Sequence, residues 1–99
     1  MQTVEYPATA QLSETLRQLS EAQRIQFNNS LGCVTQWMED EAPPSRWPAT
    51  RPAMEIVLNV FLKATAIDPE RLKTLVLLKY ELLQPKPDSL FMRHLWYSL

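Results

Sequence analysis

Glycine, cysteine and histidine are almost missing from this chain of 99 residues, which has one of each. All-β proteins use glycine repeatedly in tight turns and bulges, so a single glycine argues against a β architecture. It also argues against a glycine-rich phosphate-binding loop. Cys33 cannot form an intrachain disulfide, and Cys33 with His94 is too small a set for a cysteine–histidine metal site. The sequence therefore predicts an all-α protein with no metal and no cofactor.

Strong charge and long apolar runs are also lacking. The net charge is −1 and the sequence pI is about 5.8, so the chain as a whole exerts no strong pull on nucleic acid or anionic lipid. No run approaches the roughly 20 apolar residues of a membrane-spanning helix. The first seven residues have neither the basic nor the apolar segment of a secretory signal. We expect no membrane association and a cytoplasmic location.

Helix-start signals are what the sequence does contain. Asp68 can cap a helix that begins with Pro69, and Ile67 and Leu72 occupy the positions of a hydrophobic staple. Ser20 lies three residues before Gln23, which is the pattern of a capping box. Together with apolar periodicity, these signals predict a compact bundle of four to five short helices, at about residues 9–19, 21–40, 52–66, 69–84 and 90–97.

A proline-rich segment separates the second and third predicted helices. Four prolines surround Trp47 here: Pro43, Pro44, Pro48 and Pro52. Because proline removes a helical hydrogen bond, the spacing predicts an extended or turn-rich connector over residues 42–52. Residues 1–41 then form an N-terminal helical pair and residues 53–99 a three-helix portion. Neither part is large enough to close its own core, so residues 1–99 are expected to form one domain.

Two charged features conflict with the predicted helices. Glu39, Asp40 and Glu41 place three acids at the negative end of a helix dipole, which predicts fraying there. Lys79 falls among the apolar residues of the fourth helix, so it must reach solvent, pair with a carboxylate such as Glu55 or Glu14, or lie at a subunit interface.

Helical spacing also predicts which side chains are buried. In the second helix these are Phe27, Leu31, Val34 and Met38, and Cys33 is expected to be a small core residue. In the fourth helix they are Leu72, Leu75, Val76, Leu78, Leu82 and Leu83. Leu77 projects outside that arc.

No catalytic constellation is visible, since His94 and Cys33 are single and lack a nucleophile motif, so we expect a non-enzymatic protein. The third and fourth helices carry more apolar circumference than short neighbours can cover, and aromatic residues cluster near residue 99. These features predict an adaptor, assembly or regulatory protein that binds protein and forms a homodimer. The candidate partner-binding residues are Trp47, Leu77, Phe91, Trp96 and Tyr97. Trp47 could instead be a lid on the core, and the C-terminal aromatics could close the core.

The alternative is a DNA-binding transcriptional regulator with a helix-turn-helix-like joint at residues 54–84. Arg71 and Lys73 would then contact DNA. Against this alternative, Asp68 and Glu70 would repel phosphate at the start of the recognition helix. The sequence therefore favours protein over nucleic acid as the partner.

Overall fold

The computed structural model describes residues 14–64 and 69–99, and no strand occurs in these two ranges. Its elements are α2 (Glu21–Glu39), the 3₁₀ turn η1 (Pro44–Arg46), α3 (Trp47–Ala64), α4 (Pro69–Leu82) and α5 (Ser89–Tyr97). Residues 14–18 are also helical. The predicted all-α helical bundle is confirmed. The predicted cap at residues 67–68 and the start of the first helix lie outside the described ranges.

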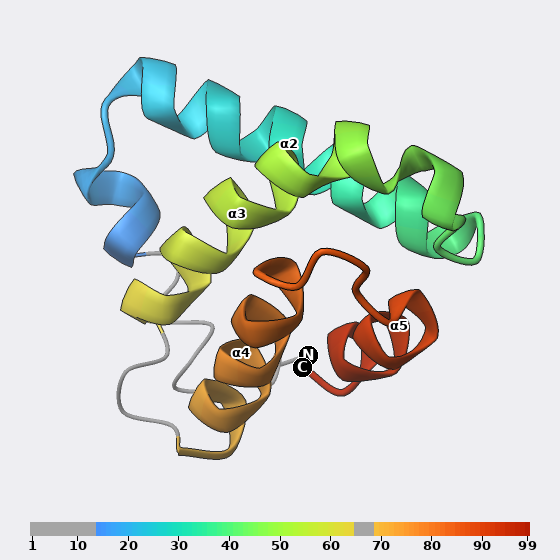
Figure 1. Ribbon diagram of the computed structural model, residues 1–99. Coiled ribbons are helices and arrows are strands. Elements are labelled where there is room, and N and C mark those ends of the chain that lie inside the picture. The colour runs from blue at the N-terminus through green and yellow to red at the C-terminus, as the bar shows by residue number, and fades with distance from the viewer. Residues whose placement is uncertain (1–13, 65–68) are drawn as a thin grey trace, which may run out of the picture.

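The helices follow one another in space as they do in sequence. Figure 1 shows α2 and α3 crossing the upper half of the molecule and α4 and α5 filling the lower half. The α2–α3, α3–α4 and α4–α5 pairs make the main helix contacts. α3 therefore lies between α2 and α4, which agrees with its nearly all-round apolar sequence.

The start of α2 is the predicted capping box. The Ser20 hydroxyl accepts a hydrogen bond from the backbone N–H of Gln23 at 3.1 Å. The Gln23 side-chain oxygen accepts one from the backbone N–H of Ser20 at 3.0 Å. Two amides that the first turn leaves free are thus satisfied reciprocally, and the helix begins where the sequence places it.

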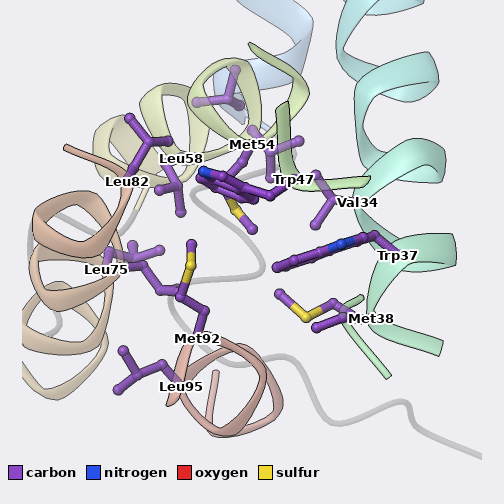
Figure 2. Close-up of a cluster of buried hydrophobic side chains, with 14 of the residues drawn as sticks. Val34, Trp37, Met38, Trp47, Met54, Leu58, Leu75, Leu82, Met92 and Leu95 are labelled. Carbon is purple, nitrogen blue, oxygen red and sulfur yellow. The ribbon is translucent and has the colours of Figure 1, made fainter. Parts of the chain in front are cut away.

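The core is built from α2, α3, α4 and α5. Figure 2 shows Trp37 and Met38 of α2 facing Trp47 and Met54 of α3, with Met92 of α5 below them. All but Trp47 are fully shielded from solvent, and Trp47 is 8% exposed. Of the apolar residues predicted for the second helix, Leu31 is only half-buried, whereas the other three are buried.

The predicted proline-rich connector between the second and third helices is confirmed, but it is shorter than predicted, because α3 begins at Trp47 and not near Pro52. Pro48 is the second residue of the helix, where a backbone N–H would have no intrahelical partner. Pro52 lies one turn later and is exposed. It removes a single hydrogen bond, to the carbonyl of Pro48, which a long packed helix tolerates.

An ion pair joins the acidic C-terminal end of α2 to η1, across the turn between them. Asp40 caps the helix and accepts a hydrogen bond from Arg46 Nη1 at 2.8 Å. Glu41 and Ala42 turn the chain with φ values of 66° and 51°, and the Ala42 N–H reaches the Trp37 carbonyl at 2.8 Å. Arg46 thus supplies the positive charge that the last turn of α2 lacks.

Three burial predictions are corrected by the packing. Val76 and Leu83 are exposed, because α4 turns the side of Leu75, Leu78 and Leu82 toward the core. Cys33 is exposed rather than buried. It precedes the buried Val34 by one residue, and a helix rotates successive side chains by about 100°.

Lys79 finds a polar partner, although not the predicted carboxylate. Its ammonium donates to the Asn59 side-chain oxygen of α3 at 3.1 Å. Asn59 is one helical turn beyond Glu55, on the polar strip of α3. The long lysine stem thus follows the α3–α4 seam while its charge stays at the surface.

Candidate interaction surfaces

α4 exposes an apolar face opposite its buried side. This α4 face consists of Val76, Leu77 and Tyr80 of the helix and Leu83 directly after its last residue. Residues 76, 80 and 83 are spaced by four and three, so they fall on one narrow stripe of the helix. Tyr80 is 61% exposed and Leu83 is 63% exposed. An α-helix with apolar residues on both sides has more apolar surface than its own core uses.

Two hollows are lined by residues of α4 and α5. The first has a volume of about 390 Å³, and its lining includes Leu77 of the α4 face and Ser98. The second, of about 380 Å³, also contains Ser98 and is lined by Leu90 and Tyr97 of α5. Ser98 is the residue that the two linings share. We refer to the two hollows together as the Ser98 surface.

Basic groups rim the Ser98 surface. The first hollow is lined by Arg71 and Lys73 with Glu70, and the second by Arg93 and His94. The Arg93 guanidinium lies 5.3 Å from the centre of the Tyr97 ring, a cation–π arrangement that orients the tyrosine. Cations thus outnumber the one acid at this rim.

Hydrogen bonds fix the position of α5, and with it half of the Ser98 surface. Asp88 caps α5 by accepting from the Phe91 N–H at 3.1 Å, and the Asp88 N–H donates to the Glu81 carboxylate at 3.0 Å. Arg93 Nε donates to the Met38 carbonyl at 2.8 Å, which ties α5 to the end of α2. The surface is therefore held by elements from both halves of the chain.

The predicted partner-binding residues are distributed between this surface and the core. Leu77 and Tyr97 both line the Ser98 surface. Phe91 is 37% exposed on α5. Trp96 is half-buried and stacks on Phe61 at 6.1 Å between ring centres. Trp47 is part of the core, so it is the lid and not the protruding anchor of the two predicted alternatives.

Five exposed apolar residues are absent from the predicted partner-binding set: Ile25, Val76, Tyr80, Leu83 and Leu90. Val76 and Leu83 were assigned to the buried arc of the fourth helix. The spacing of Val76, Tyr80 and Leu83 was itself a signal for a second apolar stripe, since Tyr80 lies between two aliphatic residues on the same side. Which stripe faces inward depends on neighbouring helices, and the sequence of α4 does not contain that information.

The described residues contain no group of three or more histidine, cysteine, aspartate or glutamate side chains placed to hold a metal ion. His94 lies on the surface. In residues 14–64 and 69–99, none of the helices combines the length and the apolar character needed to cross a bilayer.

The fold and its surfaces define this chain as a small all-α protein. Comparison with known proteins does not assign it to a narrower class. Protein-family models, curated proteins and solved structures give no match to it.

Proposed function

We propose that this chain is a small non-enzymatic interaction module, an adaptor or assembly protein, that forms a homodimer through the α4 face. The observation that supports this most is the position of its exposed apolar residues. Of the eight large hydrophobic side chains exposed in residues 14–64 and 69–99, seven lie between Val76 and Tyr97. Scattered apolar residues are normal on a surface, whereas their concentration on neighbouring elements is typical of an interface.

A second copy fits the α4 face by symmetry. In a two-fold arrangement the same patch pairs with itself, and antiparallel α4 helices would place Val76 of one copy opposite Tyr80 of the other. Burying large apolar and aromatic side chains in this way contributes most of the binding free energy in helix–helix interfaces. The second hollow of the Ser98 surface, whose lining shares no residue with the α4 face, is then available to a different protein.

The apolar character of α4 favours protein over DNA as the partner. A recognition helix needs polar and basic side chains toward the base edges and phosphates. α4 instead turns Val76, Tyr80 and Leu83 outward. We also propose a cytoplasmic location, which the single cysteine supports because a reducing compartment does not select for disulfides.

Light scattering after size exclusion, across a dilution series, tests the proposal. The wild-type chain should show a concentration-dependent dimer, and Tyr80→Glu should weaken dimerisation at least tenfold, since it buries an unpaired carboxylate in the interface. Ile25→Glu is the matched control, because Ile25 is the exposed large hydrophobic residue that lies in α2, away from α4. A monomer at all concentrations, or an equal effect of both substitutions, would contradict the proposal.

A further inference from the structure

A second kind of site lies where the two proline-containing connectors meet. It is a pocket of about 320 Å³ lined by Trp47. Pro44 and Pro48 of η1 and α3 form one wall, and Pro85 and Pro87 of the α4–α5 loop form the other. We call it the Trp47 pocket. Its volume lies at the lower end of the range of small-molecule sites.

The walls of the Trp47 pocket are mostly proline, which leaves them few hydrogen-bond donors. Proline has a fixed φ and no backbone N–H, so four prolines offer ring surfaces and no amide donors. Arg51 Nε donates to the Leu82 carbonyl at 3.1 Å, and this bond holds the start of the α4–α5 loop against α3. A ligand entering such a preformed site loses little free energy to ordering of the protein.

Two side chains in the lining, those of Lys86 and Ser89, are polar, and both can donate a hydrogen bond to a ligand. Lys86 is the charged residue in its lining, and Ser89 contributes a hydroxyl. Within the described part of the chain Lys86 forms no ion pair. The nearby Asp88 carboxylate is engaged as the cap of α5. The pocket therefore complements a ligand with an apolar body and one negative group that accepts hydrogen bonds.

We propose that the Trp47 pocket binds a small amphipathic carboxylate. The apolar part of the ligand packs between the indole edge of Trp47 and the proline rings, and its carboxylate pairs with Lys86 and accepts from the Ser89 hydroxyl. This site is separate from the α4 face, so it does not depend on dimerisation. It adds a small-molecule ligand to a chain whose other surfaces fit protein.

Phenylacetate is a suitable probe, and its binding can be followed in the ¹H–¹⁵N spectrum of the full chain. We expect saturable shifts of the Trp47 indole N–H and the Ser89 amide with a dissociation constant of about 1 mM or tighter, and no shift of the Trp96 indole. Phenylacetamide has the same shape without the charge and should bind about tenfold more weakly. Lys86→Gln should abolish this preference for the acid.

Lys63→Gln is the matched control, since this exposed lysine lies about 24 Å from Trp47 along the α3 axis. It should leave the preference unchanged. The proposal is overturned if Trp47 shows no saturable shift up to about 10 mM phenylacetate. It is equally overturned if acid and amide bind alike, or if the preference survives Lys86→Gln.

Discussion

Trp37 of α2 and Trp47 of α3 pack against each other with 5.2 Å between their ring centres. The Trp37 indole N–H also donates to the Pro43 carbonyl at 2.8 Å. The Trp37 side chain thus fills part of the core and also holds Pro43, the first residue of the proline segment. The close α2–α3 connection and the early start of α3 both follow from this pair, since Trp47 must stand in the first turn of the helix to reach Trp37.

Trp37→Phe should therefore destabilise the protein by about 1–3 kcal/mol. The substitution keeps an aromatic ring but leaves the Pro43 carbonyl without its donor and opens a small cavity. Urea unfolding monitored by circular dichroism measures the change. Trp96→Phe is the control, because Trp96 is only half-buried and stacks on Phe61 at the edge of the core. An equal loss in both variants would show that the Pro43 bond contributes nothing.

Ser20→Ala should cost about 1 kcal/mol, because it removes the hydroxyl that accepts from the Gln23 N–H at the start of α2. Ser45→Ala, at an exposed position of η1, should change the free energy of unfolding by less than about 0.5 kcal/mol. The same urea titration compares the two. If the Ser20 variant is as stable as the Ser45 variant, the capping box does not hold this helix end in solution.

The two prolines of α3 should respond in opposite ways to replacement by alanine. Pro52→Ala restores the hydrogen bond to the Pro48 carbonyl and should raise stability by about 1–2 kcal/mol, after allowing for the more flexible unfolded chain. Pro48→Ala should be neutral or slightly destabilising, since its N–H would have no intrahelical acceptor. Thermal unfolding of both variants tests the placement of the helix start. If Pro52→Ala brings no stabilisation, Pro52 lies in the first turn and the helix begins further along the chain than Trp47.

Local signals predicted the all-α class and most helix positions. The Ser20–Gln23 box marks the start of α2, and Asp88 caps α5. Such signals depend on a few neighbouring residues, so they can be read without the fold. The start of α3 could not be read in this way. Its prolines oppose a helix locally, and only the packing of Trp47 on Trp37 favours one.

The candidate surfaces were predicted less well, for a related reason. Both stripes of α4 are apolar, and the difference between Leu75 and Val76 appears only when α3 and α5 cover one side. Trp47 and Trp96 were expected at an interface because large aromatics are common there, yet a domain of 99 residues also uses them in or against its core. Leu77 and Tyr97 line the two hollows that share Ser98, and this arrangement depends on the turn between α4 and α5, which helical periodicity does not describe.

Asp40 and Arg46 provide a test by pH. The hydrogen bond from Arg46, followed by the one from Gln36 and the arginine charge, lowers the pKa of Asp40 below its ordinary value. A carboxyl whose folded pKa is depressed binds its proton more readily when the chain is unfolded. Its contribution to stability is therefore present above the ordinary aspartate pKa and is lost as the pH falls through the depressed folded value. The ion pair is exposed, so the effect on stability is small and salt-sensitive.

NMR titration of the Asp40 carboxyl should give a low pKa that rises toward the ordinary value in Arg46→Ala. Arg17→Ala is the control, because Arg17 pairs with Glu14 instead and should leave the Asp40 titration unchanged. An ordinary Asp40 pKa in the wild-type chain would show that the bond closing the acidic end of α2 does not persist in solution.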